Sequence, residues 1–197
     1  MSAGELMVLF GPPAVGKMTV GRAVCARSAV APGPVWRLFH NHHTIEPLHE
    51  IFGQDSPAFG TLNAEFRRRV IEEAAATGVH LVFTTVWNLA GERDAAYVRG
   101  LVAPYADRGL AVRFVELHAD LPTRLERNAG ADRLNAKPSK RDLAWSVAHL
   151  HAREEAFTMN TSPGVALPGD EVLADFSHLR LDTTHLGPDE AAARILA

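Results

Sequence analysis

The segment from Gly11 to Thr19 (GPPAVGKMT) constrains this chain more than any other. The apolar run Glu5–Phe10 precedes it and predicts a buried strand, and helix-forming residues follow over Lys17–Ser28. Between a strand and a helix, glycines let the backbone wrap tightly. Its N–H groups then point at anionic oxygens, and the helix N-terminus adds partial positive charge. The segment therefore predicts a loop that binds the phosphates of a nucleotide.

Lys17 is the candidate catalytic residue of this loop, because its mobile charge can reach the β- and γ-phosphates. Loops of this kind usually continue with Ser or Thr, whose hydroxyl holds Mg²⁺. Here that residue is Met18, whose thioether is a poor ligand for a hard cation. Thr19 lies about 100° further around the helix, where we expect it to contact the α-phosphate. The expected cofactors are ATP and Mg²⁺, with no protein ligand assigned to the metal. The expected nucleotide contacts of the loop are Gly11, Pro12, Pro13, Ala14, Val15, Gly16, Lys17, Met18 and Thr19.

Short apolar runs alternate with helical patterns along the rest of the chain. Further strands are predicted over 35–39, 79–86, 111–117 and 179–182. Helices are predicted over 17–28, 45–52, 59–77, 91–108, 121–128, 141–159 and 188–196, with a polar turn at 40–44 and a loop at 161–169. The alternation indicates right-handed βαβ crossovers and a parallel sheet covered on both faces. No repeat or long linker divides residues 1–197, which are predicted to form a single domain.

Composition narrows the class of partner and the compartment. The net charge of −3 argues against nucleic acid or a membrane surface as a general partner. No run approaches the roughly 20 apolar residues of a membrane span, and no signal-peptide pattern opens the chain. The lone Cys25 cannot form an intramolecular disulfide, which favours a reducing compartment. We therefore expect a cytoplasmic protein; the sequence does not define its oligomeric state.

The segments GPPAVGKMTVG, FHNH (39–42) and EFRRR (65–69) together resemble the shikimate-kinase-like, AAA-type small P-loop kinases. More narrowly, they resemble the bacterial ATPases grouped beside shikimate kinase that carry GKMT. The resemblance implies a three-layer α/β/α P-loop NTPase fold, with a five-stranded parallel sheet in the order 2-3-1-4-5. It also implies a small helical lid, over about 124–141, that closes over ATP. The implied activity is transfer of the γ-phosphate to a hydroxyl of a small acceptor.

Four residues resemble functional residues of that family. Arg67 stands in a Phe-Arg pair that resembles the pair whose arginine grips the acceptor's carboxylate. Arg133 resembles the lid arginine that reaches the transferred phosphate. Asp182 and Thr183 resemble the loop beside the adenine. The family's acidic pair after the second strand and its Gly-rich turn after the third are replaced here by residues 40–42 and 84–88, so shikimate itself is not the expected acceptor.

Ligands collect at the carboxyl ends of parallel strands, and polar residues follow two of the predicted strands there. The expected acceptor-binding residues are His40, Asn41, His42, Arg67, Thr85, Trp87 and Asn88. His40 or His42 could take the acceptor proton as a general base, although a turn cap or a backbone hydrogen bond explains either equally well. Trp87 could stack on the acceptor or cover the sheet edge. Two histidines lack the further ligands that zinc requires, so no metal site is predicted.

The segment 124–141 is rich in basic residues, and like charges this close repel unless an anion joins them. A triphosphate is the obvious anion. Arg133 is therefore predicted to be catalytic and Arg127 to bind the nucleotide, whereas Arg124 and Lys140 are expected at a solvated helix end.

The favoured function is an ATP-dependent small-molecule kinase acting on a metabolite, nucleoside or antibiotic. Met18 leaves open an NTP-binding or NTP-hydrolysing regulatory module with little transfer. A polynucleotide 5′-hydroxyl kinase is a second alternative, against which the acidic net charge argues.

Overall fold

Five parallel strands form the centre of the computed structural model, which describes residues 4–130 and 138–197. The strands are β1 (Glu5–Phe10), β2 (Trp36–His40), β3 (His80–Thr85), β4 (Ala111–His118) and β5 (Ser177–Asp182). Their order is β2-β3-β1-β4-β5, so the predicted α/β/α fold and strand order are confirmed. Strand β1 lies in the middle, with Phe10 in register with Thr85 of β3 and Glu116 of β4. The loop that leaves Phe10 therefore emerges between the ends of two neighbouring strands.

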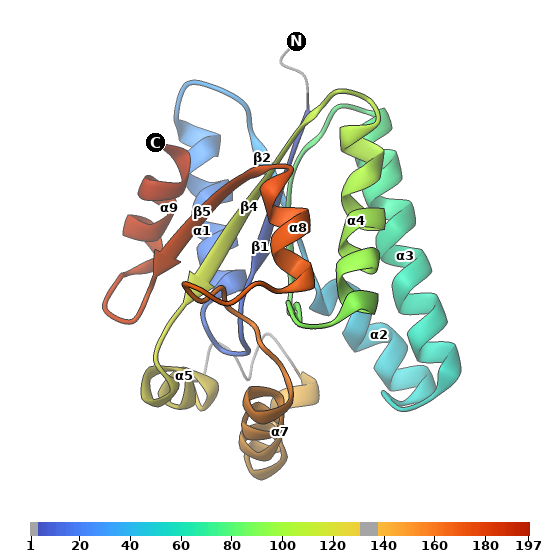
Figure 1. Cartoon of the computed structure of the whole chain (residues 1–197), viewed down its shortest axis with the longest axis vertical. Coiled ribbons are helices and arrows are strands. Elements are labelled where there is room, and N and C mark those ends of the chain that lie inside the picture. Colours follow the sequence, from blue (N-terminus) through green and yellow to red (C-terminus); the bar gives the residue numbers. More distant parts are fainter. Residues whose placement is uncertain (1–3, 131–137) are drawn as a thin grey trace.

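Helices cover both faces of this sheet (Figure 1). They are α1 (Lys17–Val30), α2 (His42–Phe52), α3 (Pro57–Ala76), α4 (Glu92–Ala106), α5 (Leu121–Asn128), α7 (Leu143–Ala156), α8 (Pro168–Ala174) and α9 (Pro188–Leu196), with a 3₁₀ turn at Pro138–Lys140. Helices α1 and α9 pack on one face, and α3, α4 and α8 on the other. Helices α5 and α7 lie beyond the carboxyl ends of the strands. None of the helices within the described ranges is both long and apolar enough to cross a membrane.

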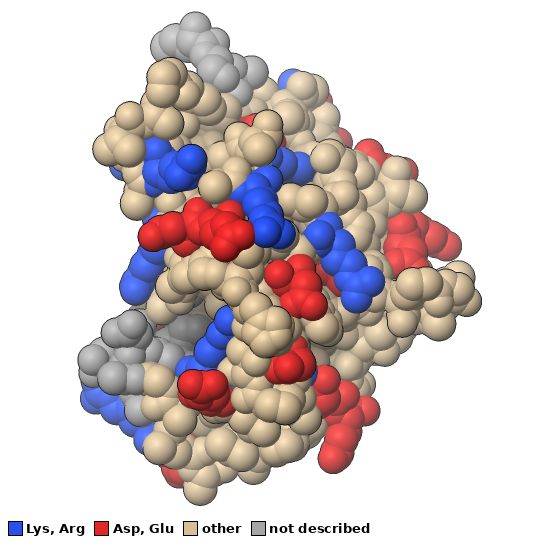
Figure 2. Space-filling model, turned by 90° about the vertical axis from the view of Figure 1, so that its left-hand side faces the viewer, with Lys and Arg blue, Asp and Glu red and all other residues tan. Residues whose placement is uncertain are grey.

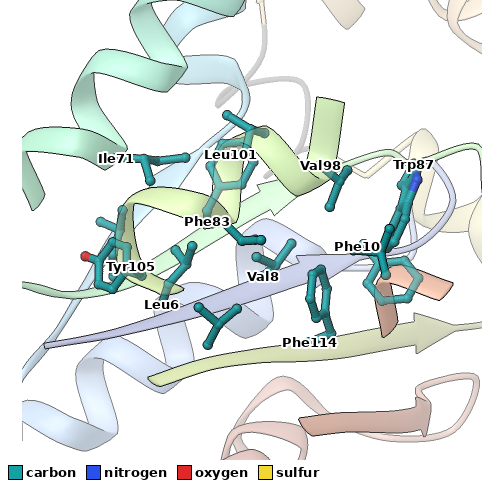
Figure 3. Close-up of a cluster of buried hydrophobic side chains, with 14 of the residues drawn as sticks. Leu6, Val8, Phe10, Ile71, Phe83, Trp87, Val98, Leu101, Tyr105 and Phe114 are labelled. Carbon is teal, nitrogen blue, oxygen red and sulfur yellow. The ribbon is translucent and has the colours of Figure 1, made fainter. Parts of the chain in front are cut away.

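Alternation along β1 divides the core into two layers, because successive side chains of a strand point to opposite faces. Leu6, Val8 and Phe10 pack with the α3, α4 and α8 side, and Figure 3 shows them beside side chains of α4. Met7 and Leu9 pack with α1 and α9. A strand buried on both faces reads as an unbroken apolar run, which is why the sequence located β1 correctly.

Two segments differ from the sequence prediction. Helix α2 begins at His42, inside the predicted turn, because the Asn41 carbonyl accepts the first helical hydrogen bonds. Pro47 then lies within the helix, where it removes one backbone bond but does not end it. The loop predicted over 161–169 contains the start of α8, with Pro168 in its first turn, a position that tolerates proline.

Replacing Ser56 with alanine is expected to destabilise the fold by about 1 kcal/mol, which lowers the melting temperature by roughly 2–4 °C. The Ser56 hydroxyl caps α3 by accepting a hydrogen bond from the backbone N–H of Phe59 at 3.1 Å. Thermal unfolding of the variant measures the effect, with Ser162→Ala in an exposed loop as the control. A melting temperature equal to that of the control would contradict the capping role.

Candidate functional site

A cavity of about 1120 Å³ lies at the carboxyl ends of the strands. The phosphate loop and the start of α1 form one part of its wall. The ends of β2 and β3, with α3, form another, and side chains of α5 and α7 complete it. One cavity thus joins the predicted nucleotide and acceptor regions, because the crossovers of a parallel sheet bring these loops to the same edge.

The phosphate loop has the left-handed backbone that its glycines suggested. Gly11 has φ 137° and Gly16 has φ 104°, and Ala14 between them has φ 63°. A side chain at Gly11 would also place its Cβ 2.2 Å from the carbonyl oxygen of Leu117 on β4. The loop can therefore pack against β4 only with glycine at that position.

Lys17 is folded back over this loop, with 9% of its surface exposed. Its Nζ donates to the carbonyl oxygens of Gly11 at 2.6 Å and Pro12 at 2.7 Å. The ammonium group is thereby held at the mouth of the loop, where it lines the cavity. Met18 is buried and Thr19 exposed, and both also line the cavity.

Arg127 connects the phosphate loop to the loop that follows β5. Its Nη2 donates to the Thr183 carbonyl at 2.7 Å, and its Nη1 donates to the Val15 carbonyl at 3.4 Å. The Thr183 hydroxyl lies 3.2 Å from the same Val15 oxygen. Arg127 and Thr183, both expected to bind the nucleotide, therefore border the phosphate loop directly.

Arg67 is a buried cation at the other end of the cavity, with 7% of its surface exposed. Its Nε donates to the Thr44 hydroxyl at 3.1 Å and its Nη2 to the Asn41 carbonyl at 3.3 Å. These partners are neutral, and within the described part of the chain no carboxylate forms an ion pair with Arg67. A buried guanidinium without a counter-charge is suited to bind an anionic ligand.

His42, Asn41 and Thr85 also line the cavity, as the sequence predicted for an acceptor site. The His42 Nδ1 lies 2.6 Å from a carboxylate oxygen of Glu46, one turn later on α2. Burial raises the pKa of the Glu46 carboxyl, but hydrogen bonds from His42 and Ser139 outweigh it and lower the pKa to about 2. Glu46 is therefore ionised near neutral pH.

The structure does not bring the side chains of Trp87 and Asn88 to the cavity wall. Trp87 is 1% exposed, and its ring lies edge-on to Phe10, with 5.2 Å between centroids, inside the core (Figure 3). The Asn88 Oδ1 accepts hydrogen bonds from the backbone N–H groups of Ala90 and Thr158, so this side chain shapes its own loop.

His40 and Asp182 likewise lie away from the cavity wall. His40 is buried at the end of β2, with its ring 3.7 Å from the ring of His43 between centroids. The Asp182 side chain is 65% exposed and accepts a hydrogen bond from the backbone N–H of Thr184. This hydrogen bond shapes the loop that carries Thr183.

Part of the predicted lid lies outside the described residues, including Arg133 and Lys137; the side chain of Lys140 is not described either. Arg124 differs from its prediction as a solvated residue. It is 3% exposed and forms a 2.8 Å ion pair with Glu154, which joins α5 to α7.

Sequence reasoning missed several polar residues of the cavity wall. They include Asn63, Asp94, His149 and Arg153. Asp94 stands in the first turn of α4, where acidic residues are common for reasons of helix stability, so its position carried no functional signal. His149 and Arg153 are spaced four apart on α7 and so share one face, a pattern that could have indicated them.

Comparisons with known proteins identify the fold. No protein-family model matches the chain, and no curated protein sequence does. A sugar kinase from Janibacter sp. HTCC2649 matches with a TM-score of 0.59 at 16% identity, over 99% of this chain and 93% of that one. An APS kinase from Mycobacterium tuberculosis, in complex with AMPPNP and APS, matches with a TM-score of 0.58 at 18% identity, over 100% and 97%. Shikimate kinase from Acinetobacter baumannii, in complex with shikimate, matches with a TM-score of 0.52 at 15% identity, over 99% and 92%.

These likenesses show that the chain has the fold of the small P-loop kinases. At such low identity they show the fold alone. The narrower resemblance to bacterial ATPases with GKMT stays a prediction.

Proposed function

We propose that this protein is an ATP-dependent phosphotransferase that moves the γ-phosphate to a hydroxyl of a small acceptor. One observation carries the proposal: a single cavity joins the Lys17 phosphate loop to a second polar end that contains Asn41, His42 and the buried Arg67. A module that only bound a nucleotide would not need this second end. The nucleotide of the M. tuberculosis neighbour, AMPPNP, supports ATP as the donor.

Transfer of a phosphoryl group depends mainly on positioning and on neutralising charge. Lys17 would hold the β- and γ-phosphates after giving up its loop carbonyls, because a phosphate is a stronger partner for an ammonium group. Arg127 would hold the phosphate loop against the loop after β5, and Arg153 adds a cation from α7. The role of Arg133 at the transferred phosphate is proposed from the family resemblance alone.

The cavity residues fit a Mg²⁺ ion that takes most of its ligands from phosphates and water and few from the protein. Within the described ranges, no group of three or more His, Cys, Asp or Glu side chains is arranged to hold a metal by itself. The Asp94 carboxylate lines the cavity and would hold the ion, directly or through water, because the usual hydroxyl is missing at Met18. The bound ion would neutralise the charge that develops on the phosphates.

Arg67 narrows the proposed acceptor to a hydroxyl compound that carries a carboxylate or another anionic group. With labelled ATP and Mg²⁺, we expect phosphoryl transfer to anionic hydroxyl metabolites rather than to neutral sugars, nucleosides or antibiotics. Arg67→Met should lower kcat/KM for the acceptor by roughly 10- to 150-fold, since hydrogen bonds to charged groups contribute about 1.5–3 kcal/mol.

Arg68→Met, an exposed change at the next residue of α3, is the matched control and should keep wild-type transfer. If no acceptor raises ADP formation above the rate without acceptor, the kinase proposal fails. If Arg67→Met and Arg68→Met had equal effects, the proposal that the acceptor carries an anionic group would be contradicted.

Met18 supports a second candidate, an NTP-binding or NTP-hydrolysing regulatory module. The side chain is 8% exposed and occupies the position of the usual metal-holding hydroxyl. ATP binding that is equally tight with and without Mg²⁺, in the absence of any transfer, would favour this candidate.

The polynucleotide 5′-hydroxyl kinase has less support. Acidic and basic side chains are interspersed over the face that Figure 2 shows, rather than gathered into one basic track for a nucleic-acid strand.

A further inference from the structure

A carboxylate fixes the orientation of the cavity histidine His42. The residue is the first of α2, separated from the end of β2 by Asn41, and is 7% exposed. Its Nδ1 lies 2.6 Å from the Glu46 Oε1, a short contact between side chains on the same face of the helix. His42 lines the same cavity as Lys17 and Arg67, so its ring belongs to the wall where transfer is proposed.

Glu46 is in turn held by Ser139, from the turn that precedes α7. The Ser139 backbone N–H donates to Oε2 at 3.1 Å, and its hydroxyl donates to Oε1 at 2.7 Å. Because the carboxyl is ionised, both of its oxygens only accept hydrogen bonds. The His42 Nδ1 must therefore carry a proton, and in the neutral ring the lone pair lies on Nε2.

We propose that Glu46 is a positioning residue that holds His42 in the Nδ1–H form, so that Nε2 takes the proton of the acceptor hydroxyl during phosphoryl transfer. This inference rests on the proposed kinase function. As the acceptor oxygen forms its bond to the γ-phosphorus, the hydroxyl O–H bond breaks and its proton moves to Nε2. The bond from the γ-phosphorus to the bridging oxygen breaks at the same time, and ADP leaves with that electron pair.

The carboxylate of Glu46 then stabilises the imidazolium that has formed. Other charged or titratable groups near the ring are Arg67 of α3, which bonds the Asn41 carbonyl, and His40 of β2, whose ring centroid lies 6.5 Å away. Lys17 lines the same cavity. Since Arg67 and Lys17 oppose a further positive charge, Glu46 supplies the counter-charge that the protonated ring requires.

Glu46→Gln tests the inference, because the Ser139 backbone N–H dictates how the new amide must lie. That N–H can only donate, so the amide oxygen must take the Oε2 position and the NH₂ group must face His42. An NH₂ group beside Nδ1 requires a lone pair there, which moves the proton to Nε2. The substitution therefore converts a proton acceptor that faces the hydroxyl into a donor.

Nitrogen NMR of histidine-labelled protein at pH 8 measures this directly, and the absence of the signal in His42→Asn identifies His42 among the ten histidines. We expect protonated Nδ1 and unprotonated Nε2 in the wild type, the reverse in Glu46→Gln, and the wild-type pattern in the exposed control Glu50→Gln. A wild-type ring with its proton on Nε2, or one protonated on both nitrogens at pH 8, would overturn the inference. So would a Glu46→Gln signal identical to that of the wild type.

Kinetics give a second readout once an acceptor is known. General-base catalysis contributes about 100- to 10,000-fold, so Glu46→Gln should lower kcat by at least about 100-fold with the KM for ATP unchanged. Glu46→Asp should restore part of this loss. An unchanged kcat would contradict the role of Glu46. If no acceptor is ever phosphorylated, the proposed function fails. The NMR measurement still shows which nitrogen of His42 is protonated and whether Glu46 determines this.

Discussion

Glu116→Ala is expected to lower the free energy of unfolding by about 1–3 kcal/mol, the usual cost of leaving hydrogen-bond donors without their acceptor. Glu116 lies on β4 with 0% of its surface exposed. Its oxygens accept hydrogen bonds from the Asn160 Nδ2 at 2.8 Å, from the Thr161 N–H at 2.9 Å and hydroxyl at 2.7 Å, and from the His178 Nε2 at 3.1 Å. Removing the carboxylate leaves these half-buried donors without their acceptor.

The same substitution is also expected to affect the candidate functional site. Asn160 and Thr161 follow α7, so Glu116 anchors the chain that leaves the helix carrying His149 and Arg153 over the cavity. We therefore expect weaker ligand binding as well as lower stability. Urea unfolding monitored by circular dichroism measures the loss of stability. Glu155→Ala, at an exposed position of α7, is the control; a loss for Glu116→Ala no larger than for this control would contradict the anchoring role.

The pH dependence of this effect has a defined sign. Burial raises the pKa of Glu116, but hydrogen bonds from His178, Thr161 and Asn160 outweigh it, so the folded pKa lies below the ordinary value of about 4.3. A depressed folded pKa contributes stability that is present above the unfolded pKa and is lost as the pH falls through the folded pKa. The stability difference between wild type and Glu116→Gln should thus be largest near neutrality and shrink below about pH 4.

Lys17→Met is expected to weaken ATP binding by roughly 10- to 150-fold, since a hydrogen bond to a charged group contributes about 1.5–3 kcal/mol. Methionine keeps most of the length of the side chain and removes the charge. Isothermal titration calorimetry with an ATP analogue measures the loss. Arg27→Met, an exposed substitution in the last turn of α1, controls for general loss of positive charge.

Lys17 also donates to two carbonyls of its own loop, so the substitution could weaken binding by disturbing the loop rather than by losing a phosphate contact. Inorganic triphosphate separates these cases by its salt dependence. Loss of a direct charge contact flattens the dependence of affinity on salt, whereas a disturbed loop leaves its slope unchanged. If Lys17→Met bound the ATP analogue with wild-type affinity, the proposal that this loop binds the phosphates would be contradicted.

Contiguous residues determined the centre of the fold. The run Glu5–Phe10, the glycines at 11 and 16 and the helix from Lys17 were located correctly, because a buried strand, a left-handed turn and a helix start are each set by neighbours in the chain. Strand order followed from the family resemblance and agrees with the handedness of crossovers. His42 and Thr85 were expected at one cavity because strand ends meet at one edge, whereas Arg67 was expected from the family resemblance and Arg127 from the charge of the segment 124–141.

Tertiary structure alone decided where the remaining side chains lie. Trp87 follows a strand end as a site residue would, yet its side chain turns into the core, where it packs against Phe10 and Phe114. Asp94 and Arg153 reach the cavity because α4 and α7 are packed over it, and α7 is anchored through Glu116, 44 residues before Asn160. Such contacts join residues far apart in the sequence, and their geometry depends on packing that no local pattern encodes.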